Sequence, residues 1–242
     1  MIWYVFNLLV YQPLYNGLVF LIGIIPSYDV GIAVIILTII ARILLYPLAR
    51  RAIESQMAMK KVAPEIEAIK KKYKGDPAQQ SKATFALYKE RGVHPFAGAL
   101  VGIAQIPILL GLYWVFAWGG LPDVDPDLLY SFVHAPAGVN MEFLGFVDMG
   151  ASHNVVLALL VGLSQLTYMR ISMGPRGSQT PAEAVESSFS TDMAKSFDVQ
   201  MRYVFPITFA VVAYFVVAAA PLYWLTANLA MIAQEYFSGR RF

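Results

Sequence analysis

The sequence contains no cysteine and few charged residues. Without cysteine there can be no disulfide bond, thiolate metal site, cysteine nucleophile or bacterial lipoprotein anchor. Asp, Glu, Lys and Arg together account for 14% of the 242 residues, against roughly 25% in soluble domains. Hydrophobic residues account for 58%, and the mean hydropathy is +0.57. This composition predicts a membrane protein whose surroundings are lipid rather than water.

Lys and Arg are absent from residues 1–41. A signal peptide needs a basic segment before its apolar core, and organellar transit peptides are rich in Arg. We therefore expect no targeting peptide, and the first helix is predicted to belong to the mature protein.

Motifs of the common enzyme classes are also missing. The three histidines, His94, His134 and His153, fall in predicted loops on different sides of the membrane, which disfavours a zinc site. Ser164 lacks the second glycine of a nucleophile elbow. No glycine-rich phosphate loop ends in Gly-Lys-Ser/Thr. We expect a protein that is not an enzyme and that needs neither a metal nor a cofactor.

The chain instead has long apolar stretches. Residues 30–49 supply 20 residues, which at about 1.5 Å per residue cross a hydrocarbon core of about 30 Å. The apolar run at 203–237 is 35 residues long, too long for one span, and we divide it near Pro221. Five transmembrane helices are predicted, at residues 30–49, 96–118, 151–172, 201–218 and 221–237.

The basic residues orient these spans. Eleven of the 18 Lys and Arg residues lie between Arg50 and Arg91, whereas the loop at 119–150 carries five acidic residues and no basic one. By the positive-inside rule, segments 50–95 and 173–200 are predicted to be cytoplasmic and the acidic loop extracytoplasmic. We therefore expect an integral protein of the cytoplasmic (inner) membrane with its N-terminus outside and its C-terminus in the cytoplasm.

Residues 2–25 allow two interpretations. They are apolar enough to span the membrane, but an N-terminus on the inside would have no basic residue to hold it there. Asn7, Gln12 and Asn16 form a weak polar stripe, and aromatic residues of the headgroup region accompany it. We predict an amphipathic helix in the outer interface, with a sixth span as the alternative.

Arg42 stands near the middle of the first predicted span, where an arginine costs about 2.5–3.5 kcal/mol to insert. One interpretation is that its side chain reaches the headgroups near Ala49. The other is a hydrated cavity inside the helix bundle, which suits a guanidinium because it keeps its proton. The spans contain no acidic residue except Glu235, near the end of the last one. Arg42 is therefore predicted to attract a carboxylate or polar group from another molecule.

Other polar residues of the predicted spans could line the same cavity, although each is also a common interhelical hydrogen-bonding residue. They are Thr38, Gln105, Ser164, Gln165, Thr167, Thr226 and Asn228.

Segment 50–95 predicts a helical hairpin. Apolar residues recur every three to five positions from Ile53 to Tyr73, and Asp76 followed by Pro77 indicates the start of a second helix. The alternative is a solvated loop that only fixes the topology. A hairpin would also offer a basic surface to anionic lipid or ribosomal RNA. The lysines predicted for that surface are Lys60, Lys61, Lys70, Lys71, Lys72 and Lys74.

Several stretches, in this order, resemble the YidC/Oxa/Alb family of membrane protein insertases. They are Leu37–Leu48, with Arg42 five residues before Pro47; Pro64–Tyr73; Leu87–Lys89 ahead of His94-Pro95; Gln105–Tyr113; and Leu222–Leu229. The resemblance implies an all-α membrane protein with five transmembrane helices, an N-terminal interfacial helix and a cytoplasmic helical hairpin. It also implies a hydrophilic groove that is open to the cytoplasm and to lipid but closed on the outside.

The resemblance further implies a mechanism and partners. Arg42 would be the central charge of the groove, and Gln105 and Trp224 would face it. A nascent hydrophobic segment would enter the groove with its short polar outer tail, and the helix would leave sideways into lipid without ATP. The expected partners are nascent membrane proteins, with the ribosome and anionic lipids at the hairpin and no DNA. Work beside a Sec translocon is left open.

The chain departs from the family pattern in two places. His94 stands where asparagine is usual, and Ala218–Pro221 replaces a Pro-Ser-Gly turn before the last span. The large extracytoplasmic domain of Gram-negative members and a long basic C-terminal tail are not found, so the resemblance is to a minimal member. The alternative functions are a small-solute channel or secondary transporter with Arg42 as an anion anchor, and a structural subunit of a larger complex.

Overall fold

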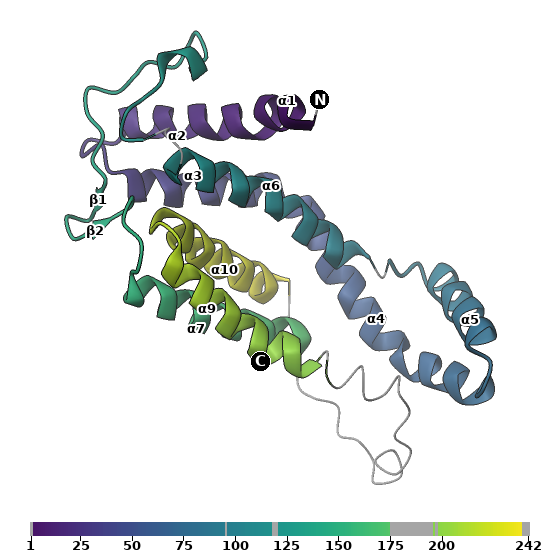
Figure 1. Cartoon of the computed structure of the whole chain (residues 1–242). Coiled ribbons are helices and arrows are strands. Elements are labelled where there is room, and N and C mark those ends of the chain that lie inside the picture. Colours follow the sequence, from purple (N-terminus) through teal and green to yellow (C-terminus); the bar gives the residue numbers. More distant parts are fainter. Residues whose placement is uncertain (1, 95, 118–120, 175–195, 197, 239–242) are drawn as a thin grey trace. The chain divides into compact units, whose positions relative to one another are not determined.

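The computed structural model describes residues 2–94, 96–117, 121–174, 196 and 198–238, which are mostly helical (Figure 1). Most of the predicted loop at 173–200 lies outside the described residues. The fold divides into two compact units, described separately below: a larger unit, Met1–Arg42 with Pro107–Phe242, and a smaller unit, Ile43–Ile106. The helices are α1 (Ile2–Phe6), η1 (Asn7–Tyr11), α2 (Gln12–Ile24), α3 (Val30–Leu44), α4 (Tyr46–Lys72), α5 (Pro77–Glu90), α6 (Ala97–Ala117), η2 (Pro126–Leu128), α7 (Val155–Met173), η3 (Gln200–Val204), α9 (Phe205–Phe215) and α10 (Ala219–Phe237).

Two helices of the described part are long and apolar enough to cross a membrane: Trp3–Ile24 and Val155–Met173. The second corresponds to the predicted span at 151–172. A third arises if α3 and α4 count as one broken span, and Gly102–Phe116 is a shorter apolar stretch. The chain is thus a helical membrane protein, while the number of five spans stays a prediction. Because Trp3–Ile24 is long enough to span, both interpretations of residues 2–25 stay open.

The predicted span at 30–49 is not a single helix. α3 ends at Leu44, and Leu45 separates it from α4, which has Pro47 in its first turn. Proline has no amide hydrogen, and its ring disfavours helical backbone at the residue before it. The apolar composition continues to Ala49, but the proline ends the first helix earlier.

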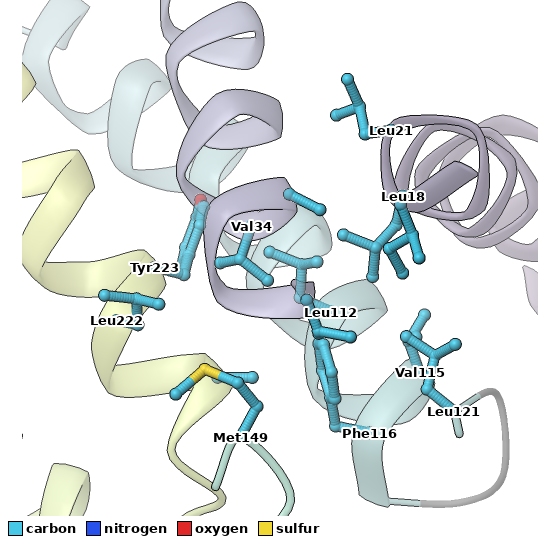
Figure 2. Close-up of a cluster of buried hydrophobic side chains, with 14 of the residues drawn as sticks. Leu18, Leu21, Val34, Leu112, Val115, Phe116, Leu121, Met149, Leu222 and Tyr223 are labelled. Carbon is cyan, nitrogen blue, oxygen red and sulfur yellow. The ribbon is translucent and has the colours of Figure 1, made fainter. Parts of the chain in front are cut away.

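The core of the larger unit lies where α2, α3, α6 and α10 meet. Figure 2 shows Leu18 of α2, Val34 of α3, Leu112 of α6 and Tyr223 of α10 side by side in this core. All four side chains are buried. Met149, from the predicted acidic loop, is also buried in the same cluster. The loop therefore packs onto the helices.

Polar residues of α2 bind the backbone of this loop. The amide nitrogen of Asn16 donates to the Leu128 carbonyl at 2.8 Å, and its oxygen accepts from the Tyr130 amide at 2.6 Å. The Tyr15 hydroxyl accepts from the Asp125 amide at 2.7 Å. Asn16 is only 2% exposed, so it does not lie on a solvent-facing polar stripe as the sequence suggested.

We expect Asn16→Leu to destabilise the protein by about 1–3 kcal/mol, because it leaves buried backbone groups of the loop without partners. The midpoint of thermal unfolding in detergent should fall by several degrees. Asn7→Leu is the matched control, since Asn7 lies one helix earlier and no hydrogen bond ties its side chain to the described loop. Equal midpoints for both variants would contradict this role of Asn16.

A short antiparallel hairpin interrupts the predicted acidic loop. β1 (Glu142–Phe143) pairs with β2 (Val147–Asp148), with Phe143 opposite Val147. Leu144 and Gly145 between the strands have positive φ angles of 53° and 78°, which is typical of a tight hairpin turn. The fold is therefore mostly helical, as predicted, with one small sheet in this loop.

Asp29 joins the start of α3 to this hairpin. Its carboxylate accepts from the amides of Ile32 at 3.0 Å and Leu144 at 2.9 Å, and the residue is 3% exposed. Gly31 lies so close to the ring of Phe143 that a Cβ there would overlap it. The first turn of α3 and the hairpin are thus packed together.

α7, α9 and α10 form a compact helical layer (Figure 1). A Cβ on Gly162 of α7 would lie 2.9 Å from the Cβ of Ala210 on α9, so this glycine permits the close approach of the two helices. The start of α10 is buried at its N-cap Ala218 and at its first residues, Ala219 and Ala220. The amides of Ala218 and Ala219 donate to the carbonyls of Ala151 and Met149. Small residues therefore fit this turn in place of the usual Pro-Ser-Gly.

Arg202 ties the beginning of the helix before α9 to the end of α7. Its guanidinium donates to Asp198 at 2.7 Å and to the carbonyl of Gly174 at 2.7 Å. Gly174 is the C-cap of α7 and has a φ of 69°, a conformation that favours glycine.

In the smaller unit, α4 and α5 pack against each other. Val62 of α4 and Leu87 of α5 are buried, together with Val93 after α5. The side chain of Asp76 caps α5 by accepting from the Gln79 amide at 3.0 Å, as predicted. At the edge of the pair, Arg91 donates to Glu65 at 2.9 Å. That hydrogen bond, and then the charge of Glu65, raise the pKa of the Arg91 guanidinium above its usual value.

Ser55 of α4 holds the chain where it leaves α5. Its hydroxyl donates to the His94 carbonyl at 2.6 Å and accepts from the His94 amide at 3.1 Å, and Ser55 is buried. Both bonds use the backbone of His94. They are therefore available to any residue at this position that has an amide hydrogen, whether histidine or asparagine.

We expect Ser55→Ala to lower the thermal midpoint by a few degrees, because the amide and carbonyl of His94 lose two hydrogen bonds worth about 0.5–1.5 kcal/mol each. His94→Asn should leave the midpoint unchanged within about one degree, since the side chain takes no part in these bonds. A large effect of His94→Asn would show that the imidazole itself holds this turn.

Candidate functional site: a buried arginine facing α7 and α10

Arg42 and Thr38 lie one turn apart on α3, so both face the same side of the helix. Thr38 is 1% exposed, and its hydroxyl donates to the Val34 carbonyl at 2.6 Å. This bond satisfies the hydroxyl within its own helix and leaves the guanidinium of Arg42 as the only charge on this face of α3.

Arg42 is 5% exposed. A side chain that reached the headgroups would extend out of the protein, so this burial favours a location inside the helix bundle. Its charge interacts with the phenol groups of Tyr223 on α10 and Tyr168 on α7. Among the described residues no carboxylate lies within ion-pair distance of its guanidinium. Within that part of the chain, Arg42 is a buried cation without a counterion.

Buried polar residues continue the site on α7 and α10. The amide nitrogen of Asn228 donates to the Ser164 hydroxyl at 3.1 Å, and that hydroxyl donates to the Val161 carbonyl at 2.9 Å. Gln165, beside Ser164, is 5% exposed. Tyr168 lies one turn further along α7. Buried polar side chains thus lie on both α7 and α10, and that they face Arg42 stays a prediction.

The remaining predicted groove residues are Gln105 and Trp224. The ring of Trp224 packs against Phe209 of α9 with centroids 5.1 Å apart and is partly buried among apolar residues. Gln105 lies on the part of α6 that belongs to the smaller unit and is half-buried. Whether Gln105 and Trp224 face the same groove as Arg42 stays a prediction.

The six lysines predicted as a contact surface are all exposed on or just after α4. They are Lys60, Lys61, Lys70, Lys71, Lys72 and Lys74. Lys70, Lys71 and Lys72 occupy the last turn of α4, where positive charge stabilises the helix dipole. The three lysines of this last turn therefore have a structural role in addition to any contact with a partner.

Sequence reasoning missed the two tyrosines beside Arg42. Tyr168 and Tyr223 lie in apolar stretches, where an aromatic residue is more often part of the core than of a site. For Tyr168 the spacing is a usable signal, because it follows Ser164 by four positions and so lies on the same face of α7. Tyr223 precedes Asn228 by five positions, which is not a spacing that indicates a shared face.

The arrangement suits attraction of a negative or polar group. A buried cation lowers the cost of bringing a carboxylate into a low-dielectric site. Around it lie hydroxyl and amide groups that can exchange hydrogen bonds with a polar segment. Among the described residues no group of three or more His, Asp or Glu side chains could hold a metal ion.

Comparison with known proteins gives consistent matches. A family model described as "60Kd inner membrane protein" matches residues 21–242. The chain is 32% identical over 209 residues to "Membrane protein insertase YidC" of Clostridium tetani, which covers 86% of the chain and 81% of the relative. It is 30% identical over 230 residues to the protein of the same name from Fusobacterium nucleatum, with 94% and 96% covered. It is also 30% identical over 229 residues to "ALBINO3-like protein 1, chloroplastic" of Arabidopsis thaliana, with 86% and 42% covered.

Proposed function

The chain belongs to the YidC/Oxa/Alb family of membrane proteins, and we propose that it is a membrane protein insertase that uses Arg42 to draw polar segments into the bilayer. A nascent hydrophobic segment enters a hydrophilic groove that is open to the cytoplasm and to lipid. Its short polar outer tail is held near Arg42 while the apolar part moves sideways into lipid. The step uses no ATP.

The observation that carries this proposal is the burial of Arg42 without a carboxylate partner among the described residues. An arginine in the membrane interior costs about 2.5–3.5 kcal/mol even on the lenient translocon scale. A protein that needed Arg42 only for its own folding would place an acidic residue beside it. An insertase needs the charge to be available for the acidic residues of an incoming tail.

The proposed topology follows from the distribution of Lys and Arg along the sequence. Five spans at 30–49, 96–118, 151–172, 201–218 and 221–237 place the α4–α5 pair in the cytoplasm and the β1–β2 loop outside. The loop 119–150 then covers the outer end of the larger unit. Closure on this side would keep the groove from becoming a pore across the cytoplasmic membrane.

The α4–α5 pair is the proposed contact for cytoplasmic partners. Its exposed lysines favour anionic lipid headgroups or the phosphates of ribosomal RNA.

The proposal is tested by depleting the insertase of a bacterial host and expressing this chain in its place. We expect growth to recover and a small single-span substrate with an acidic outer tail to become protected from protease added to the cytoplasmic side. An empty plasmid supplies the background. If the chain reaches the membrane at normal levels and the substrate still remains uninserted, the insertase proposal is wrong.

Independence from ATP needs a separate experiment. Purified chain in liposomes should insert the same substrate equally well with and without ATP, and liposomes that lack the chain should insert much less. A requirement for ATP would contradict the proposed energy source and leave the insertase activity itself unaffected.

A further inference from the structure

A second site lies between the same helices as Arg42 and has the opposite character. Side chains of α3, α7 and α10 enclose a cavity of about 720 Å³ together with the β1–β2 hairpin. Ile35, Leu157, Leu160, Leu222 and Leu225 contribute to its apolar wall, and Phe146 of the hairpin covers one end. None of the polar residues around Arg42 lines it.

The cavity opens on the surface that faces lipid. Leu160 and Leu229 both line it and are 41% and 54% exposed. Val156, at the start of α7, lines it and is 66% exposed. In a membrane this mouth meets hydrocarbon chains and not water, so an apolar molecule can enter from the side.

The lining offers little to a polar group. The Thr226 hydroxyl donates to the carbonyl of Leu222 at 2.8 Å. The side-chain oxygen of Asn154 accepts from the amide of Leu157 at 2.9 Å, where it caps α7. Both residues line the cavity and are engaged with their own helix. An extended peptide in the cavity would lose backbone hydrogen bonds worth several kcal/mol. A hydrocarbon chain loses none, and neither does a helix, which satisfies its own backbone.

Size also distinguishes a transmembrane helix from an acyl chain as the occupant of the cavity. A helix about 10 Å wide that crosses about 30 Å of hydrocarbon fills roughly 2,400 Å³. The cavity holds about 720 Å³, less than a third of that volume. A flexible acyl chain has a smaller cross-section and can bend through the mouth.

We propose that this cavity is a lipid site, in which α3, α7 and α10 bind one acyl chain of a membrane phospholipid beneath the β1–β2 hairpin. The head group stays at the mouth. The bound chain keeps the outer part of the helix layer packed when no substrate is present, which is a role separate from the charge of Arg42. This lipid site is proposed whether or not the protein is an insertase.

The test uses native mass spectrometry of the full chain, purified in mild detergent from membranes that contain phosphatidylglycerol and phosphatidylethanolamine. We expect the wild type to retain one phospholipid. Ala230→Trp, which fills the cavity from α10, should reduce the retained fraction at least fivefold. Ala233→Trp is the matched control, because Ala233 is exposed one turn further along α10 and does not line the cavity. Its retention should equal that of the wild type.

A second measurement identifies the occupant directly. A photo-crosslinking amino acid at Leu225, at the cavity wall, should form adducts with phospholipid in cells. Retention that is unchanged by Ala230→Trp, or lost equally in both variants, would overturn the proposal. Adducts with nascent polypeptide and none with lipid would also overturn it and assign the cavity to the substrate. Neither result alters the complementation test of the insertase function.

Discussion

Arg42→Ala is expected to reduce insertion of a substrate with an acidic outer tail by about tenfold or more. A charge-assisted hydrogen bond to a carboxylate contributes about 1.5–3 kcal/mol, and about 1.4 kcal/mol corresponds to a factor of ten in rate. Insertion is measured as the protease-protected fraction of the substrate after a short pulse in the depleted host. Arg42→Lys should retain most of the activity because the charge is kept, and Arg42→Glu should be the least active variant.

Two controls make this result specific for the charge. Neutralising the substrate tail by Asp→Asn changes should remove most of the difference between wild type and Arg42→Ala, as expected when two groups act through one interaction. Arg50→Ala, which removes an exposed cation paired only with Glu54 at the protein surface, should behave like wild type. Equal activity of the Ala, Lys and Glu variants at normal membrane levels would reject the role of Arg42 in the groove.

The sequence predicted the elements of the structure that depend on composition. The membrane character, the cap at Asp76 and the location of α7 follow from apolar runs and from capping chemistry, which are local properties. The predicted span continues to residue 49 because the apolar run passes Pro47, whereas α3 itself ends at Leu44. A stronger weight on the backbone effect of proline would have corrected this boundary.

The candidate site was only partly accessible from the sequence. Arg42 stands out because a charge in an apolar run is expensive, whatever surrounds it. Its neighbours Tyr168 and Tyr223 come from helices that are far apart in sequence, and only the packing of the larger unit brings them near it. The apolar cavity gives no signal at all in the sequence, since its lining residues are those of any transmembrane helix. Asn16 and Asp29 were missed for a related reason: their partners are backbone groups of a distant loop.

The second large effect is expected at Asp29. Its carboxylate is 3% exposed and accepts from the amide of Ile32, at the start of α3, and from the amide of Leu144, in the hairpin turn. Loss of a helix cap costs about 1 kcal/mol, and loss of a charged acceptor for a buried amide costs about 1.5–3 kcal/mol. Asp29→Ala should therefore destabilise the larger unit by about 2–4 kcal/mol, which lowers the thermal midpoint in detergent by roughly 5–15 °C.

Variants at Asp29 distinguish its hydrogen bond with the Ile32 amide from that with the Leu144 amide. Asp29→Ser keeps a short oxygen acceptor for the Ile32 amide but cannot reach Leu144 as well, so its midpoint should fall between those of Asp29→Ala and the wild type. Asp123→Ala removes an exposed acid from the same loop and should leave the midpoint unchanged. If the hairpin is held by Asp29, Asp29→Ala should also speed cleavage near Leu144 by protease added from the outside. A midpoint of Asp29→Ala within one degree of the wild type would mean that the packing of Phe143 on Gly31 suffices to hold the hairpin on α3.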